Sequence, residues 1–190
     1  MDCERLPKVC CRTSNGETNA MKFTCTPMNE EAARAICAWR YEGEYSIYTI
    51  GDVEDTISEM LDRRSPQYAV RNEPGELVGF FAFGTSATIS AVDEPALYAE
   101  NNAIFIGLGM RPDLTGQGLG LDFIKAELDF ARQQFAPEYF RLYVLSFNKR
   151  AIRAYEKAGF ERVRTFMHHN IYGDNEFVEM MRKAAQTQKH

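Results

Sequence analysis

Three glycines at alternate positions, Gly116, Gly118 and Gly120, carry the clearest chemical signal in the chain. An apolar run over residues 104–110 precedes them, and an amphipathic helix pattern follows. Glycine allows backbone N–H groups to approach phosphate oxygens closely, and the N-terminus of a helix adds partial positive charge. This order of strand, glycine-rich turn and helix predicts a cradle for a diphosphate.

Spacing excludes the two commonest phosphate loops. A nucleoside-triphosphate loop ends in Gly-Lys-Ser/Thr, whereas this stretch has Gly120-Leu121-Asp122. The dinucleotide pattern G-x-G-x-x-G also fails, because these glycines are spaced G-x-G-x-G. Residues 115–120, with Pro112 before them, instead resemble the Gln/Arg-x-x-Gly-x-Gly/Ala signature of the GCN5-related N-acetyltransferase (GNAT) superfamily. Thr115 departs from that signature, which has Gln or Arg at this position.

A second block of residues supports the same resemblance. Residues 142–145 alternate like a buried strand, and residues 148–160 match the superfamily's N-x-x-A-x-x-x-Y-x-x-x-G-F motif. Asn148 and Tyr155 are seven residues apart, so they share one face of the predicted helix. Gly159 is a natural residue for ending that helix. With two motifs in the expected order, the chain is identified as a member of this superfamily.

The resemblance implies an α/β (α+β) fold with a mixed, mostly antiparallel central sheet and about four flanking helices. Strands 4 and 5 of this GNAT fold splay apart in a V, and the coenzyme lies in that wedge. Residues 21–183 are expected to form the N-acetyltransferase domain, with the element order β-α-α-β-β-β-α-β-α-β-β.

Periodicity and turn residues predict elements in this same order. The first helix is expected to begin with Thr26 as its N-cap and Pro27 as its first residue. The later elements are a helix over 53–61, a hairpin over 67–84, a strand over 104–110, a helix over 121–135, a strand over 142–145, a helix over 148–158, and strands over 161–168 and 176–181 that flank a turn at 173–175.

The resemblance also implies which residues bind acetyl-CoA and carry the reaction. Backbone groups of Leu108 and Met110 would pair with the pantetheine arm, and the Met110 N–H would stabilise the thioester oxyanion. Tyr155 would act as general acid, because its pKa matches that of a leaving thiolate. The coenzyme-binding set is Leu108, Met110, Thr115, Gly116, Gln117, Gly118, Leu119, Gly120, Asn148, Arg150 and Tyr155. The purely structural alternatives are packing for Tyr155, helix capping for Asn148 and a solvated helix face for Arg150.

An aromatic segment over residues 39–48 is a candidate wall of the acceptor site, because the loop between the first two helices helps to form that site in the superfamily. The candidates are Trp39, Tyr41, Tyr45 and Tyr48. Ordinary packing of a helix end is the alternative. A general base is harder to name, because the strand over 104–110 contains no acid. Glu100, Glu42, Glu44, one of His168 and His169, and a water relay all stay open.

The implied activity is direct transfer of an acetyl group from acetyl-CoA to a primary amine of a small molecule or peptide, in a ternary complex. A non-catalytic acyl-CoA-binding or sensor protein is one rival, favoured by the missing strand acid. A protein N-terminal acetylase is another, because such enzymes reuse the same core. The aromatic segment favours a closed pocket for a small molecule.

Charge and hydropathy argue against nucleic-acid and membrane partners. The chain of 190 residues has a formal net charge of -5 and a pI near 5.3, so we expect no nucleic-acid partner. No apolar run approaches the length of a membrane span, and no secretory h-region follows the start. We therefore predict a cytoplasmic protein without a membrane partner. A homodimer is compatible with the resemblance, since dimers are common in the superfamily.

The five cysteines lie in the first fifth of the chain: Cys3, Cys10, Cys11, Cys25 and Cys37. Their spacing matches no common zinc pattern, so we expect free thiols and no metal. Residues 1–20 are polar and aperiodic, which predicts a poorly ordered extension, and residues 184–190 form a polar tail.

Overall fold

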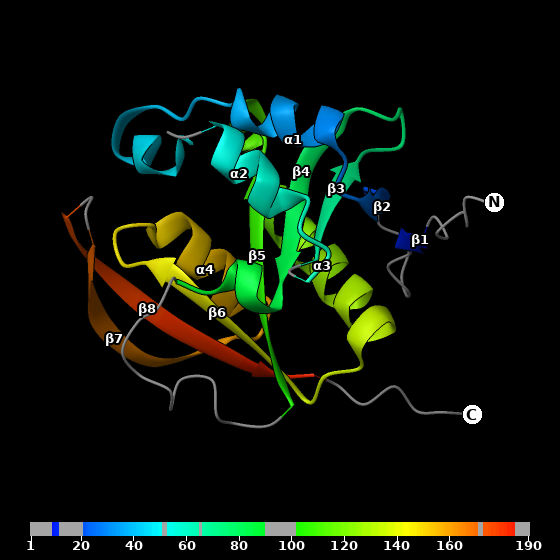
Figure 1. The fold of residues 1–190 in the computed structure, drawn as a ribbon. Helices are drawn as coiled ribbons and strands as arrows, with labels where there is room; N and C mark the ends of the chain where they lie inside the picture. Colours follow the sequence, from blue (N-terminus) through cyan, green and yellow to red (C-terminus); the bar gives the residue numbers. More distant parts are fainter. Residues whose placement is uncertain are drawn as a thin grey trace, which may run out of the picture.

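The computed structural model describes residues 9–11, 21–50, 53–64, 66–89, 102–170 and 173–184. The described strands form one sheet in the order β1-β2-β3-β4-β5-β6-β8-β7 (Figure 1). Only β5 and β6 pair in parallel, so the sheet is mixed and mostly antiparallel. The strands are β1 Val9–Cys11, β2 Phe23–Pro27, β3 Gln67–Arg71, β4 Leu77–Phe83, β5 Ala103–Met110, β6 Tyr139–Leu145, β7 Glu161–Asn170 and β8 Gly173–Lys183.

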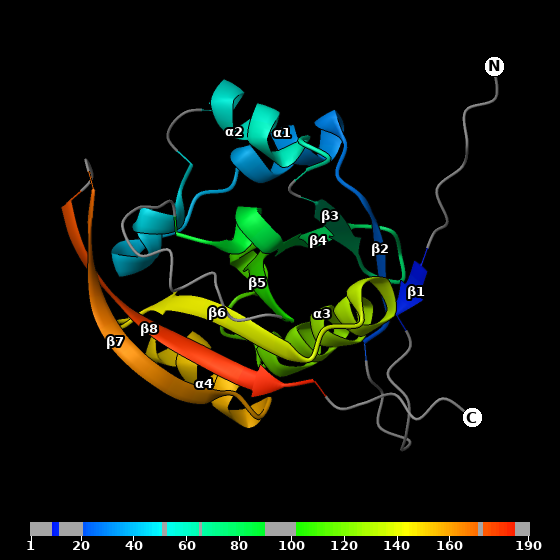
Figure 2. The same cartoon turned by 60° about the horizontal axis from the view of Figure 1, so that its bottom comes forward.

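Helices cover both faces of the sheet (Figures 1 and 2). The α-helices are α1 Glu30–Cys37, α2 Val53–Met60, α3 Gly120–Phe135 and α4 Lys149–Lys157, and short 3-10 turns are η1 Gly43–Tyr48, η2 Gly84–Ala87 and η4 Pro112–Leu114. The helices α1 and α2 pack with Leu77 and Phe80 of β4 in a small core cluster. The larger cluster lies on the other face, where α3 and α4 meet the sheet.

The parallel strands β5 and β6 are paired over only part of their length. Ala103 to Phe105 pair with Tyr139 to Arg141, and no pairing continues beyond them. Figure 1 shows the two strands separating toward their C-terminal ends. This is the V-shaped splay that the sequence predicted between strands 4 and 5, which are β5 and β6 here because β1 precedes them.

Local signals explain where the helices next to the splay begin and end. The Asn148 side chain accepts a hydrogen bond from the Ala151 N–H at 3.0 Å and so caps α4. Gly159 follows that helix with a φ of +86°, the left-handed conformation that glycine adopts most easily. At the end of α3, Ala136 is left-handed and Pro137 prevents another turn.

The predicted start of the first helix is wrong. Thr26 and Pro27 belong to β2, and Asn29 is the N-cap of α1, accepting from the Ala32 N–H at 2.9 Å. The sheet holds Thr26 and Pro27, because they pair with Ala69 and Tyr68 of β3. A tertiary contact has therefore overridden a local capping signal.

The terminal segments contribute to the fold where they are described. Val9 to Cys11 pair with Cys25 to Phe23, so the extension adds an edge strand that the sequence did not predict. At the other end, Ala184 is buried and its N–H donates to the Glu138 carbonyl oxygen at 2.8 Å. The boundaries of the domain at residues 21 and 183 stay predictions.

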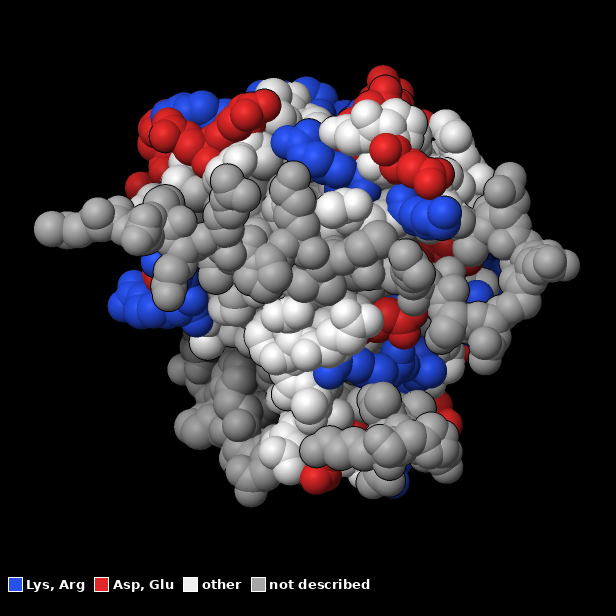
Figure 3. Space-filling view, turned by 90° about the vertical axis from the view of Figure 1, so that its right-hand side faces the viewer, with Lys and Arg blue, Asp and Glu red and all other residues white. Residues whose placement is uncertain are grey.

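The described residues hold no membrane-length apolar helix and no group of acidic, histidine or cysteine side chains that could bind a metal. Cys25 and Cys37 are buried and are not joined in a disulfide. On the face drawn in Figure 3, basic and acidic side chains lie interspersed in small groups.

Candidate active site

The open edge of β5 presents backbone polar groups to the splay. Arg111 donates its N–H to the Val78 oxygen at 2.9 Å, and the β4–β5 register runs without interruption from there. Backbone groups alternate between the two edges of a strand, so those of Leu108 and Met110 point away from β4. The Tyr41 hydroxyl donates to the Met110 carbonyl oxygen at 2.9 Å, which agrees with this direction.

Residues 115–120, called the glycine loop here, present backbone N–H groups at the mouth of the splay. Gly116 and Gly118 have φ values of +78° and +84°, a conformation that disfavours residues with a Cβ. The Thr115 hydroxyl and the Gln117 amide donate to the Pro112 and Asp113 carbonyl oxygens at 2.8 and 2.6 Å. These bonds hold the turn closed, while no described residue accepts a hydrogen bond from the N–H groups of 116–118.

The end of α3 that meets this loop is also open to an anion. Its N-cap, Leu119, has no side-chain oxygen, so the first-turn N–H groups keep their partial positive charge. Gly120 packs close to α4, where a Cβ would lie 3.7 Å from the Ala154 Cβ. This close packing sets the N-terminal end of α3 against the middle of α4.

Arg150 lies beside the glycine loop. Its Nη1 atom lies 3.4 Å from the position of a Cβ on Gly116, and its guanidinium lies 4.4 Å from the centre of the Tyr45 ring. It makes no ion pair with a described carboxylate. Arg150 is therefore free to pair with a phosphate group.

Tyr155 lies in the last turn of α4, and 7% of its surface is exposed. Its ring packs edge-on against Phe160, with centroids 5.6 Å apart. Burial raises the pKa of Tyr155 well above the usual range, and the charges of Glu127 and Tyr48 raise it further. The hydroxyl therefore keeps its proton at neutral pH, as a general acid requires.

Three of the predicted acceptor residues gather at the splay. Tyr41, Tyr45 and Tyr48 form ring contacts with centroids 6.1 and 6.5 Å apart. Phe147, immediately before the cap of α4, contacts Tyr45 and Tyr48 at 5.7 and 6.3 Å. Phe147 was not among the residues predicted to form the acceptor site. Its only signal was its position next to the second motif.

Asn148 links this aromatic cluster to α4. Besides capping the helix, it donates a side-chain N–H to the Tyr48 hydroxyl at 3.0 Å. Enclosure raises the pKa of Tyr48, and the hydrogen bond from Asn148 lowers it in part. Burial, followed by the charge of Tyr48, raises the pKa of Tyr41 to about 12. Asn148 therefore both caps α4 and holds the Tyr48 side chain of η1.

The other candidate residues, for the acceptor wall and for the general base, do not join this aromatic cluster. Trp39 packs on Phe80 with centroids 6.4 Å apart, in the cluster beneath α1 and α2. Glu100 lies outside the described residues. His169 contacts Asp174 at 2.7 Å, and the ring of His168 packs on Phe177. The exposed Glu42 and Glu44 flank the start of η1. No general base is singled out by these positions.

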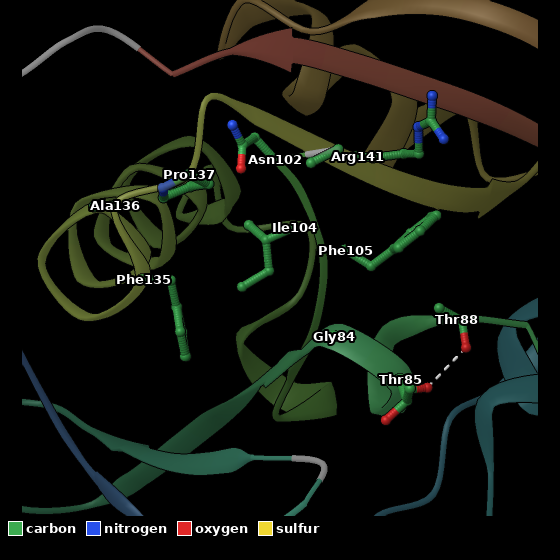
Figure 4. Close-up of a pocket in the computed structure, with 11 residues that line it drawn as sticks. Gly84, Thr85, Thr88, Asn102, Ile104, Phe105, Phe135, Ala136, Pro137 and Arg141 are labelled. Carbon is green, nitrogen blue, oxygen red and sulfur yellow. Dashed lines mark hydrogen bonds between the residues drawn. The ribbon is translucent and has the colours of Figure 1, made fainter. Parts of the chain in front are cut away.

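A cavity of about 360 Å³ lies at the opposite end of β5 from Met110. Figure 4 shows Ile104, Phe105 and Phe135 around the space between β5, η2 and the end of α3. Its polar groups bond to the protein itself, since Thr88 donates to the Thr85 oxygen at 2.7 Å and Arg141 pairs with Glu179 at 3.1 Å. The chemistry of the splay does not extend to it.

The sequence matches the model of a known protein family. The model of the acetyltransferase (GNAT) family matches residues 33–160, which include the open edge of β5, the glycine loop and α4. The chain belongs to this family. No curated protein matches it by sequence.

Solved N-acetyltransferases share the GNAT fold at low sequence identity. A chimera of spermidine N-acetyltransferase SpeG from Vibrio cholerae and hSSAT is 14% identical, with a TM-score of 0.67 over 85% of this chain and 95% of that chain. AAC(6')-Ib, in complex with ribostamycin and coenzyme A, is 20% identical, with a TM-score of 0.66 over 85% and 93%. The yncA protein of Salmonella typhimurium, with acetyl-CoA, is 17% identical, with a TM-score of 0.59 over 90% and 98%.

These findings confirm the expectations at the level of the family. The chain has the GNAT fold and is an N-acetyltransferase with acetyl-CoA as its co-substrate. The individual site residues stay predictions, and the geometry above supports them to different degrees.

Proposed function

We propose that this GNAT enzyme transfers the acetyl group of acetyl-CoA directly to a primary amine of a small molecule, with both substrates bound in the splay between β5 and β6. The observation that carries the proposal is the free edge of β5. The backbone groups of Leu108 and Met110 point away from β4 toward the splay, and both residues pack against the core cluster that includes Tyr155.

The coenzyme would lie along this edge with its pantetheine arm on β5 and its pyrophosphate at the glycine loop. The pantetheine amides would add to β5 as an extra strand, which takes its affinity from backbone groups. The pyrophosphate oxygens would accept hydrogen bonds from the backbone N–H groups of residues 116–120 and of the first turn of α3. Arg150 would lie beside them. Thr115 and Gln117 would support the loop from behind, because their side chains already bond to its backbone.

Acetyl-CoA supplies the acetyl group as an activated thioester. The Met110 N–H would donate a hydrogen bond to the thioester oxygen as negative charge develops there. Tyr155 would give its hydroxyl proton to the departing sulfur, since the hydroxyl is protonated at neutral pH. The attacking amine would lose its proton to water, because the described part of the splay presents no obvious base.

The acceptor would lie against the aromatic cluster of Tyr41, Tyr45 and Tyr48. Their rings form an apolar wall, whereas the Met110 carbonyl oxygen, now bound by Tyr41, can accept a hydrogen bond from an amine. Solved relatives include spermidine N-acetyltransferases and an enzyme bound to ribostamycin, so small polyamines and amino sugars are the first acceptors to test. A peptide acceptor, a homodimer and a cytoplasmic location stay predictions.

A thermal-shift titration with acetyl-CoA tests the coenzyme site. Ligand at about 100 times its dissociation constant adds roughly 2.7 kcal/mol to the free energy of unfolding, a shift of several degrees in a chain of this size. Gly118→Glu places a carboxylate in the cradle and should abolish the shift. Gly75→Glu is the matched control, because Gly75 also has a positive φ, +93°, and open space around it but lies in the β3–β4 turn.

The expected result is a shift in the wild type and in Gly75→Glu and none in Gly118→Glu. An equal shift in both variants would place the coenzyme elsewhere. A thiol-release assay with spermidine, ribostamycin and a short peptide with a free N-terminus then compares acceptors. Binding without turnover on any of them would contradict the proposed transfer.

A further inference from the structure

The segment over residues 41–48, called the strap below, connects the two arms of the splay. At one end the Tyr41 hydroxyl donates to the Met110 carbonyl oxygen of β5 at 2.9 Å. At the other end the Tyr48 hydroxyl accepts a hydrogen bond at 3.0 Å from Asn148, the N-cap of α4. The rings of Tyr41 and Tyr48 contact each other, with centroids 6.1 Å apart. A continuous chain of side-chain contacts therefore runs from β5 to α4.

The strap is held more extensively on α4 than on β5. Besides the hydrogen bond from the cap of α4, the Arg150 guanidinium lies 4.4 Å from the centre of the Tyr45 ring, and the Phe147 ring lies 5.7 Å from it. On β5, the bond from Tyr41 to Met110 is the one hydrogen bond that joins the strand to the strap among the described residues. Loss of this bond would free the β5 end and leave the α4 end attached.

The strap can leave β5 without unpacking the core. None of the described residues of η1 is buried, and Gly43 has a φ of +58° with open space around it. The Tyr41 backbone N–H donates to the Thr49 hydroxyl oxygen at 3.2 Å, which is a contact separate from that of its own hydroxyl. Rotation of the Tyr41 side chain is therefore enough to release Met110. Surface segments with few buried contacts open at low cost in free energy.

The oxygen that Tyr41 occupies belongs to the proposed coenzyme edge. The N–H and carbonyl groups of Met110 both point away from β4, and a pantetheine arm that adds to β5 as a strand needs this edge. Burial raises the pKa of Tyr41 to about 12, so its hydroxyl keeps the proton that it donates at neutral pH. The hydroxyl therefore satisfies the Met110 oxygen for as long as no ligand takes its place.

We propose that Tyr41 is a latch on the coenzyme site: its hydroxyl closes the β5 edge of the free protein, and acetyl-CoA displaces it from the Met110 oxygen in order to bind. This inference rests on the proposed coenzyme site at β5. The apparent affinity of a ligand falls in proportion to the fraction of protein that is open to it. The latch thus weakens the binding of acetyl-CoA, and its removal strengthens that binding.

Tyr41→Phe removes the hydroxyl and keeps the ring. We expect this variant to bind acetyl-CoA about threefold to tenfold more tightly than the wild type, the factor that one neutral hydrogen bond supplies. ADP carries the diphosphate but lacks the pantetheine arm, so it should bind both proteins equally. Tyr68→Phe is the control, because the Tyr68 ring packs 4.5 Å from Phe130 and lies in β3. Titration calorimetry with each ligand measures the affinities.

Thr49→Val provides a second variant if Tyr41→Phe melts far below the wild type. It keeps the Tyr41 hydroxyl but removes the bond that holds the Tyr41 backbone, and it should also tighten the binding of acetyl-CoA. A gain for acetyl-CoA alone supports the latch. Unchanged or weaker binding of acetyl-CoA, or an equal gain for ADP, would overturn it.

Kinetics with the best acceptor from the thiol-release assay complete the test. A lower acceptor KM in Tyr41→Phe, with no gain in acetyl-CoA affinity, would place the amine at the Met110 oxygen and overturn the latch. The proposed coenzyme site fails separately, if the wild type binds no acetyl-CoA or if Gly118→Glu binds it as tightly as the wild type. A latch failure alone leaves those two results as expected and removes only the gain in Tyr41→Phe.

Discussion

A phenol that protonates a leaving thiolate must hold its proton until the sulfur carries charge. Tyr155 meets this condition, because burial raises its pKa. Tyr41 is also held protonated, with a pKa near 12. Both tyrosines are therefore hydrogen-bond donors at neutral pH, and neither can serve as the base that takes the amine proton. This agrees with the absence of an acid on β5 itself.

Tyr155→Phe should lower kcat by about 100-fold or more, the usual size of a general-acid contribution, and leave the dissociation constant of acetyl-CoA unchanged. Tyr68→Phe is the control, because Tyr68 is also packed among aromatic rings, 4.5 Å from Phe130, but lies in β3. Steady-state kinetics and a coenzyme titration measure the two effects. Equal activity in both variants would exclude Tyr155 as the acid.

The pH profile of the wild type checks the same assignment. The value of kcat/KM should rise as the acceptor amine loses its proton. It should not turn down near pH 10, where an ordinary tyrosine ionises, because the raised pKa keeps Tyr155 protonated. A fall in kcat/KM near pH 9 would indicate a less perturbed group as the acid.

The elements that hold these residues were predictable to the extent that their signals are local. The helix after the glycine loop and the strand before it follow from periodicity, and Asn148 and Gly159 mark the two ends of α4. The β7–β8 turn was misplaced, because Gly173, at its predicted start, already pairs with Asn170. Flexible polar residues signal a turn nearby, but the pairing of the two strands decides where it falls.

Contacts between distant elements were outside the reach of the sequence. The Tyr41 hydroxyl reaches Met110 across 69 residues, and Asn148 reaches Tyr48 across 100. Spacing along one helix cannot show such contacts. Glu127 did leave a local sign, as a charged residue among apolar ones in α3, but its lack of a partner is a property of the folded protein.

Asn148 joins α4 to η1, and two variants separate its two bonds. Asn148→Ala loses both the cap and the bond to Tyr48, and should lower the free energy of unfolding by about 1 kcal/mol. Tyr48→Phe loses only the bond and keeps the ring contacts, so its stability should stay within about 0.5 kcal/mol of the wild type. Both should raise the acceptor KM. Urea unfolding and kinetics measure the difference, and an unchanged KM in both would show that the link does not shape the acceptor site.

The proposed active site lies at the seam between two parts of one sheet. The strands β1 to β5 form one part and β6 to β8 the other, and among the described residues the strand pairing that joins them is confined to Ala103–Phe105 and Tyr139–Arg141. Packing of α3 and α4 in the large core cluster holds the parts together behind the splay. The seam can stay open for a substrate because this buried layer, and not strand pairing, supplies the cohesion. Glu127 lies in that layer, so its ionisation bears on the stability of the whole fold.

This position predicts a dependence of stability on pH. In the unfolded chain Glu127 ionises near its ordinary pKa of about 4.3, whereas burial raises the pKa in the folded protein. Above about pH 4.3 the folded state therefore binds one more proton than the unfolded state, and its stability falls as pH rises, by up to about 1.4 kcal/mol per pH unit, until the folded pKa is reached. Glu127→Gln cannot ionise and lacks this contribution. The titratable groups facing the site, Tyr155 on α4 and Tyr48 on η1, are present in both proteins and cancel in the comparison.

Urea unfolding of the wild type and Glu127→Gln from pH 5 to pH 8 should thus show a stability difference that grows with pH in favour of Gln. Parallel curves would mean that Glu127 ionises alike in the folded and unfolded states, and the raised pKa of its buried carboxyl group would have to be abandoned.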